Sequence, residues 1–150
     1  MVATSTLLSD TILYTRNGLF NNITDPIQST RPSTEKFVMT SYPQRAVNYP
    51  IITVKGTITD SRRVGQQSEQ FIVFIKLEVK IWGRNEKEKN DLFDDVFNYM
   101  KDNQFGTGSS TLAELHNFKL RTALDHDEDG EQGIKSKICD YRYGFFTSNG

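Results

Sequence analysis

The sequence predicts an α+β domain, in which a largely antiparallel or mixed sheet of about five strands carries two main helices. Apolar and polar residues alternate along the middle of the chain, as in half-buried strands, and the next stretch repeats its apolar residues at helical spacing. Two more alternating stretches follow, so the expected order is helix, three strands, helix, two strands. The 150 residues fit a single domain, with residues 1–36 as an N-terminal helix and connecting loop and residues 37–150 as the α+β core.

The N-terminal stretch predicts the first helix, over residues 4–23, with a break near Asn17 and Gly18. Its apolar side chains are Leu7, Leu8, Ile12, Leu13, Leu19, Phe20 and Ile23. Residues 24–35, TDPIQSTRPSTE, contain two prolines and many small polar residues, which is typical of a loop. Residues 37–43 predict a short strand that ends at a proline.

The middle of the chain predicts two strands joined by a polar hairpin loop. Residues 51–59, IITVKGTIT, alternate as a half-buried strand does. The side chains expected on its buried side are Ile52, Val54, Gly56 and Ile58. Residues 60–69 are polar and show no period, so they are expected to form the hairpin loop. Residues 71–82, FIVFIKLEVKIW, predict a long strand that is buried on both faces in its first half and on one face in its second.

A second helix is predicted over residues 86–102. Asn85 is placed to cap it by accepting a backbone N–H, and Glu88 is placed three residues later to reach back, as in a capping box. Its apolar face holds Leu92, Phe93, Val96, Phe97 and Met100. Its opposite face is expected to be solvated and holds Glu86, Lys87, Lys89, Asp91, Asp94, Asp95 and Lys101.

The chain closes with two predicted strands. GTGSS, residues 106–110, leads out of the second helix, and it lacks the Gly-Lys-Ser/Thr ending of a nucleoside-triphosphate loop. Residues 117–125 predict a strand with Phe118, Leu120, Thr122 and Leu124 on one side. Residues 134–146 predict the last strand, which places on one side Cys139, Tyr141, Tyr143 and Phe145.

The acidic segment DHDEDG, residues 125–130, joins these strands and begins like a calcium loop. Such a loop needs a hydrophobic residue at its eighth position and a bidentate glutamate at its twelfth, where this chain has Gln132 and Ser136. We therefore expect a solvated hairpin tip with negative potential rather than a metal site. A looser cation site stays open as the alternative, and it would use Asp125, Asp127 and Asp129 with Glu131.

The composition argues against several classes of function. Eighteen Lys and Arg face nineteen Asp and Glu, so overall charge does not recruit nucleic acid or an anionic membrane. The single cysteine cannot form an intrachain disulfide, and GxSxG, HExxH and paired CxxC motifs are absent from the sequence. No catalytic residues and no cofactor are expected. No membrane partner is expected either, because the sequence lacks an apolar run of about 20 residues and a signal peptide, which favours the cytoplasm.

The main basic spot lies at Arg62 and Arg63 of the polar hairpin, with Lys55 nearby, and Arg45 is a further candidate from across the sheet. A nucleic-acid module usually carries a denser basic stripe interleaved with aromatic residues. A long polar hairpin can instead reach a neighbouring subunit and pair its arginines with carboxylates. The candidate receivers lie on the second helix and are Asp91, Asp94 and Asp95.

The order of elements resembles that of the tail terminator and tail-completion (neck) proteins of long-tailed bacteriophages and related archaeal viruses. The resemblance covers residues 37–146 and rests on YPIITVKGTITD, the polar hairpin, FIVFIKLEVKIWGRNEKEKNDLFDDVFNYM and the two closing strands. Tyr49, Pro50 and Ile51 match the family's entry to its second strand, and residues 71–100 match its long strand and amphipathic helix. The acidic tip has no counterpart in that pattern.

The resemblance implies a structural virion protein of the tail or neck, assembled in the host cytoplasm. Its copies would form a ring, a homohexamer, that caps the finished tail tube and joins it to the head. The partners implied are other copies, the tail tube protein and head-tail connector or neck proteins, while DNA passes without specific binding. Acidic lumen residues would then be Asp125, Asp127, Asp129 and Glu131. The alternatives are a small nucleic-acid-binding module and a divalent-cation-binding module.

Overall fold

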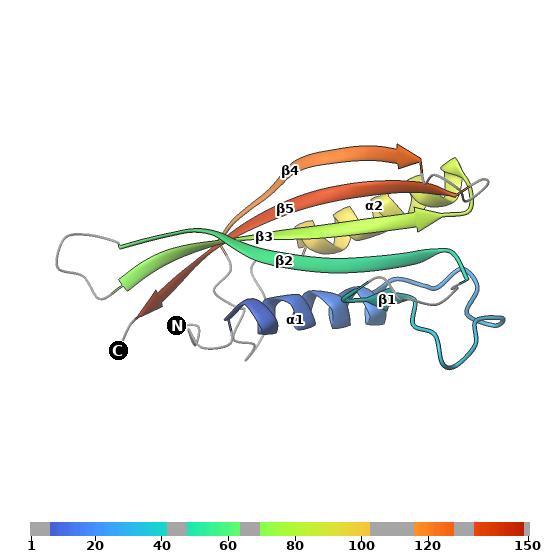
Figure 1. Cartoon of the computed structure of the whole chain (residues 1–150), viewed down its shortest axis with the longest axis horizontal. Coiled ribbons are helices and arrows are strands. Elements are labelled where there is room, and N and C mark those ends of the chain that lie inside the picture. The colour runs from blue at the N-terminus through green and yellow to red at the C-terminus, as the bar shows by residue number, and fades with distance from the viewer. Residues whose placement is uncertain (1–6, 42–47, 64–69, 103–115, 128–133, 149–150) are drawn as a thin grey trace.

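The computed structural model describes residues 7–41, 48–63, 70–102, 116–127 and 134–148. Two helices and a five-stranded mixed sheet make up the fold, which confirms the predicted α+β class and order of elements (Figure 1). The helices are α1 (Leu7–Asn22) and α2 (Glu86–Asp102). The strands are β1 (Val38–Met39), β2 (Ile51–Arg63), β3 (Gln70–Gly83), β4 (His116–Asp127) and β5 (Lys135–Ser148).

The sheet has the strand order β1-β2-β3-β5-β4, with β1 parallel to β2 and every other pair antiparallel. Register places Val54, Val79 and Cys139 side by side across β2, β3 and β5, and all three are fully buried. Both helices pack on this face, with α1 along β2 and α2 across β3 and β5 (Figure 1). The side chains between the layers include Leu19, Ile52, Leu77, Ile81, Leu92, Val96, Met100 and Tyr141.

Helix α1 runs without the predicted break near Asn17 and Gly18. The glycine serves close packing, because a Cβ on Gly18 would overlap the Tyr99 hydroxyl of α2. The predicted apolar face is also partly wrong, since Leu13 and Phe20 are exposed. The buried side chains at helical spacing are Thr11, Thr15, Leu19 and Ile23. Because Thr11 and Thr15 are polar, the spacing of apolar residues alone did not identify the buried face of this helix.

Strands β1 and β2 differ in length from the prediction. β1 comprises only Val38 and Met39, of the predicted residues 37–43, and it pairs with Ile52 and Thr53. β2 continues through residues 60–63, which were expected to be loop, because they pair with Phe71–Phe74 of β3 after a shift in register beyond Ile58. The polar side chains of residues 60–63 gave no sign of a strand. These residues are nevertheless part of β2, because strands pair through backbone hydrogen bonds.

Helix α2 begins and ends as predicted. Its first turn is capped by Asn85, whose Oδ1 accepts the N–H of Glu88 at 2.9 Å. Glu88 reaches one residue further back than a capping box does, and it accepts the N–H of Arg84 at 2.9 Å. The expectation that Lys89 is solvated is wrong, because only 1% of it is exposed.

Strand β4 does not keep the predicted alternation. Two irregularities interrupt its register with β5, one of them between Leu120 and Thr122. As a result Leu120 lies opposite Tyr141, while Leu124 lies opposite Ile138 and is 63% exposed. An extra residue at a bulge changes the face on which the following residues lie. Residues that alternate in the sequence before and after it therefore need not share one face of the sheet.

Beyond the helices, β2, β3 and β5 continue together as a three-stranded projection, here called the arm (Figure 1). Its backbone comprises residues 58–63, 70–75 and 143–148, and β3 pairs with β2 and β5 as far as Arg63 and Ser148. The arm grows out of the core, because Val73 and Ile75 of β3 are still buried members of it. Ile58, at the base of the arm, is 45% exposed, although Ile52 and Val54 on the same strand are fully buried. The predicted buried side of β2 therefore holds only where a helix covers it.

Candidate functional site

The predicted acceptor carboxylates lie together on the outer face of α2. Asp91, Asp94 and Asp95 are all exposed on this helix. Asp91 forms an ion pair with Lys87, in which Oδ2 lies 2.8 Å from Nζ. Within the described part of the chain, Asp94 and Asp95 have no ion-pair partner. The outer face of α2 therefore presents carboxylates that a neighbouring molecule can reach.

These carboxylates also affect one another electrostatically. The pKa of Asp95 is raised, first by its partial burial and then by the negative charges of Asp91 and Asp94. Asp91 and Asp95 also line a hollow of about 310 Å³ between the connecting segment and the first half of α2. Crowding of like charge favours a positively charged partner at this surface, because such a partner relieves the repulsion.

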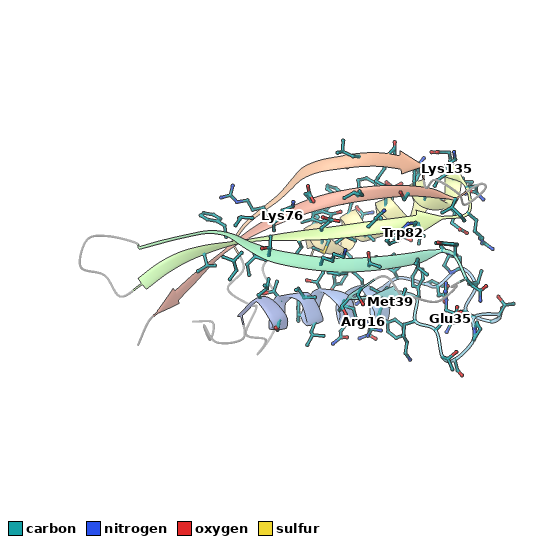
Figure 2. The ribbon with its side chains drawn as sticks, viewed as in Figure 1. Arg16, Glu35, Met39, Lys76, Trp82 and Lys135 are labelled. Atoms are coloured by element: carbon teal, nitrogen blue, oxygen red, sulfur yellow. The ribbon has the colours of Figure 1, made fainter. Side chains whose placement is uncertain are left out.

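The sheet face opposite the helices is here called the open face, because neither α1 nor α2 covers it. Alternation along the strands turns Lys76 and Lys80 away from the buried Leu77, Val79 and Ile81. Figure 2 labels Lys76 and Trp82, two of the β3 side chains on this face. Positive side chains outnumber carboxylates among the described residues of this face. The charged side chains are Lys55, Lys76, Lys80 and Arg142, with Glu78 and Asp140.

The open face keeps its charges ordered by stacking and pairing. The guanidinium carbon of Arg142 lies 4.1 Å from the centre of the Phe74 ring. The Nζ of Lys80 lies 4.6 Å from the centre of the Trp82 ring. Lys76 approaches Asp140 at 3.8 Å, while Lys55 is exposed. Both rings are almost fully buried, so they are not available for stacking on nucleic-acid bases.

The predicted basic spot lies at the end of β2. Arg62 and Arg63 pair through their backbones with Ile72 and Phe71 of β3, so they belong to the arm. Their side chains, and all of Arg45, lie outside the described residues. Within this chain the arm leads away from α2, so the structure does not join these arginines to the predicted receivers in one molecule (Figure 1). A contact between them would have to be made by two copies.

The first residue of the acidic tip is held by two lysines. The Oδ1 of Asp125 on β4 lies 2.8 Å from the Nζ of Lys89 on α2 and 3.6 Å from the Nζ of Lys137 on β5. Lys89 also donates to Glu86 at 2.8 Å, and Lys137 lies 4.4 Å from the centre of the Phe93 ring. The ion pairs tie the edge strand β4 to α2 and so hold the base of the acidic tip in place.

The pKa values at this cluster follow from burial and pairing. Burial by itself lowers the pKa of Lys89, but the hydrogen bonds that Lys89 donates to Asp125 and Glu86 outweigh this effect and raise the pKa overall. The pKa of Asp125 is lowered, chiefly by the hydrogen bond from Lys89 and further by the positive charge of Lys137. Both groups are therefore held in their charged forms.

These ion pairs argue against Asp125 as a metal ligand, because its carboxylate already compensates the charges of two lysines. Among the described residues, no group of three or more His, Cys, Asp or Glu is placed to hold a metal ion. The side chain of Asp127, and all of Asp129 and Glu131, lie outside the described residues. The looser cation site therefore stays a prediction.

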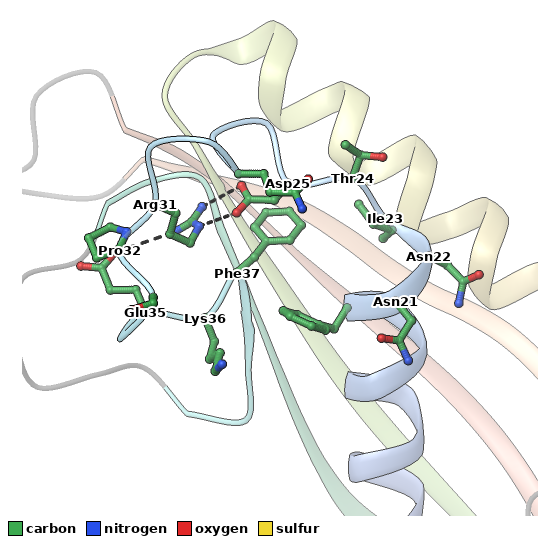
Figure 3. A pocket seen from close by; sticks show the side chains of 13 residues that line it. Asn21, Asn22, Ile23, Thr24, Asp25, Arg31, Pro32, Glu35, Lys36 and Phe37 are labelled. Carbon is green, nitrogen blue, oxygen red and sulfur yellow. Dashed lines mark hydrogen bonds and ion pairs between the residues drawn. The ribbon is translucent and has the colours of Figure 1, made fainter.

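A cavity of about 480 Å³ lies between the end of α1 and the connecting segment (Figure 3). Arg31 lies at its wall, where its Nε and Nη2 donate to Asp25 at 2.6 and 3.0 Å. Its remaining donors bind the carbonyls of Asn48 and Pro50 at 2.8 and 2.6 Å. The guanidinium is therefore used within the chain, where it holds this wall of the cavity in place.

Sequence reasoning missed three features that the fold brings together. Lys89 and Arg31 each combine a nearby acidic partner with partners from further along the chain, Asp125 for Lys89 and the carbonyls before β2 for Arg31, and no local pattern marks these distant contacts. The open face follows from register, because its charges alternate with core residues along β3 and β5. The alternation of Lys76, Glu78 and Lys80 was the signal available for this face.

The chain matches no model of a known protein family. It also matches no curated protein sequence. In the described part of the chain, neither helix is both long enough and apolar enough to cross a membrane.

Proposed function

We propose that this chain is a structural virion protein, a tail terminator or tail-completion protein of a tailed virus. Its copies form a ring, a homohexamer, that caps the tail tube and joins it to the head or neck. The observation that carries the proposal is the arm, which extends past the helical layer as a three-stranded sheet. It adds to the order of elements that resembles this family.

An arm of this kind supports assembly rather than catalysis. A closed ring needs a heterologous interface, in which one surface of each copy meets a different surface of the next. The arm and the acidic outer face of α2 are two such surfaces, and they lie in different parts of the molecule. Arg62 and Arg63 at the end of β2 are the candidate cations of this contact, and its candidate acceptors are Asp91, Asp94 and Asp95.

The acidic tip belongs on the lumen side in this proposal, where it lets DNA pass without binding. Asp125 contributes little negative potential there, because Lys89 and Lys137 compensate its charge. The lumen assignment therefore depends on Asp127, Asp129 and Glu131. The tail tube protein and a head-tail connector or neck protein are the proposed partners in the virion.

The test is the mass of the purified protein in solution across a concentration series, by sedimentation velocity and native mass spectrometry. The expected result is one ring-sized species that electron micrographs show to be closed. A double reversal, Arg62→Glu with Arg63→Glu, is expected to shift the protein toward monomer. The control is Lys36→Glu, which reverses an exposed charge of the connecting segment away from both surfaces.

Three outcomes would contradict the proposal, in whole or in part. A protein that stays monomeric at every concentration, and that does not bind isolated tail tubes, rules out a ring-forming tail protein. A ring that survives the double reversal unchanged removes the two arginines from the contact. A monomer stabilised only by added calcium would instead favour the cation-binding alternative.

A further inference from the structure

We propose that the open face of one copy binds the outer face of α2 of the next copy, so that sheet and helix layers alternate around the ring. The inference rests on the proposed function and names the surface that builds its interface. It differs from the arm contact because it uses side chains in the body of the sheet, chiefly Lys55, Lys76 and Arg142.

The placement of the two faces supports head-to-tail assembly. Helix α2 packs on one side of the sheet, and the open face is the other side of the same sheet. The two surfaces therefore point in opposite directions, and a copy that uses one of them leaves the other available. Repeating such a contact adds copies in one direction, and it closes a ring when each step includes a rotation.

The charges of the two faces are complementary in sign. Positive side chains outnumber carboxylates on the open face, while carboxylates outnumber lysines on the exposed side of α2. The charged side chains exposed on α2 are Glu86, Lys87, Asp91, Asp94, Asp95 and Lys101. Asp94 and Asp95 have no ion-pair partner among the described residues, so cations of another copy are free to approach them.

The mixture of signs favours a protein partner over nucleic acid. Glu78 and Asp140 lie in the middle of the open face, at paired positions of β3 and β5. A phosphate backbone would be repelled by both carboxylates, whereas α2 brings Lys87 and Lys101 to meet them. Leu124, 63% exposed on the neighbouring edge strand, adds apolar surface of a kind that protein interfaces bury.

The dimensions of the two surfaces also agree. Helix α2 has 17 residues and so is about 25 Å long. The distance along β3 from Lys80 to Ile72, the backbone partner of Arg62, spans eight residues and so is about 27 Å. One neighbouring helix therefore matches the length of the open face together with most of the arm.

The experiment is a charge swap on the full chain, read as the dissociation constant of the assembly by sedimentation equilibrium. Reversing the sheet side, Lys55→Glu with Lys76→Glu, is expected to weaken self-association at least about tenfold, as is Asp94→Lys with Asp95→Lys. Combining all four changes is expected to restore much of the affinity. Lys36→Glu is the matched control and should leave the assembly unchanged. If the reversed sheet side fails to fold, as a melting curve would reveal, Lys55→Gln with Lys76→Gln replaces it.

The outcomes separate the inference from the proposed function. A ring whose affinity is the same in all variants overturns the inference and leaves the function standing. A wild-type chain that never self-associates, and that does not bind tail tubes, overturns both. Retention of duplex DNA at physiological salt, lost in Lys55→Glu with Lys76→Glu while association is unchanged, would reassign the open face to a nucleic-acid partner.

Discussion

The Nζ of Lys89, a residue only 1% exposed on α2, lies 2.8 Å from Oδ1 of Asp125 on the edge strand β4. The partners differ in solvation, because the carboxylates of Asp125 and Glu86 remain 65% and 60% exposed. Only the lysine depends on its partners for compensation. Removing the carboxylates should therefore cost more stability than removing the lysine charge.

Replacing Lys89 by methionine keeps the buried stem and removes the ammonium, so we expect a change within about 1 kcal/mol in the free energy of unfolding. The double variant Glu86→Gln with Asp125→Asn leaves the ammonium buried without a carboxylate, and we expect a loss of about 2 kcal/mol. Chemical denaturation of both variants measures the difference. Equal losses, or a larger loss in Lys89→Met, would contradict the asymmetry.

The Asp125 ion pair should also show in the pH dependence of stability. Because the pKa of Asp125 is lowered in the folded state, its contribution is present above the ordinary value of 3.8 and is lost as pH falls through the folded pKa. Asp125→Asn should destabilise the protein at neutral pH, and the difference from wild type should shrink below about pH 4. Unfolding curves across this range test it. A difference that stays constant on acidification would place the effect elsewhere.

Local signals recovered α2 well, because its periodic apolar face and its Asn85 cap lie within one stretch of sequence. The environment of Lys89 was missed because Asp125 and Lys137 come from strands that follow it in the chain. β2 was predicted too short for a similar reason. Its polar residues 60–63 are strand because of a partner strand, not because of their own pattern.

The candidate site follows the same division between local and distant information. Asp91, Asp94 and Asp95 were correctly placed on an exposed helix, since spacing within one helix decides which face they share. The open face needed the pairing of β3 with β5, which brings Lys76 opposite Arg142. Which strands become neighbours is settled by packing of the whole sheet, so composition alone did not reveal this surface.

Arg31 pairs with Asp25 of the same connecting segment (Figure 3). It fastens this segment to the start of β2 by donating to the carbonyls of Asn48 and Pro50. Lysine carries all its donors on one nitrogen and cannot reach Asp25 and both carbonyls as the planar guanidinium does. Arg31→Lys should therefore cost about 2 kcal/mol of unfolding free energy. The control is Arg16→Lys, because Arg16 makes fewer contacts than Arg31: it donates to the carbonyl of Val38 at 2.9 Å and to Oδ1 of its exposed neighbour Asn17 at 3.0 Å. Thermal and chemical unfolding should show the smaller loss in the control, and equal losses would contradict the assigned role of Arg31.

Cys139 is a core residue of β5, fully buried, and its burial raises the pKa of the thiol to about 12. The thiolate is the reactive form, so the native protein should react slowly with a disulfide reagent near pH 8. The release of thionitrobenzoate should become fast and stoichiometric once guanidinium unfolds the chain. Rapid stoichiometric reaction of the native protein would show that β5 opens or that the thiol is accessible.

Gly18 on α1 lies against the hydroxyl of Tyr99 on α2, so that a Cβ at position 18 would meet that oxygen. Replacing glycine by alanine inside an exposed helix usually stabilises a protein by about 1 kcal/mol. Here we expect Gly18→Ala to destabilise instead, because the two helices must separate or the tyrosine must leave its place. In a Tyr99→Leu background the obstructing hydroxyl and ring end are gone, and the same change should recover its usual sign. A double-mutant cycle of unfolding free energies measures this reversal, and additive effects would show that the two residues are not coupled.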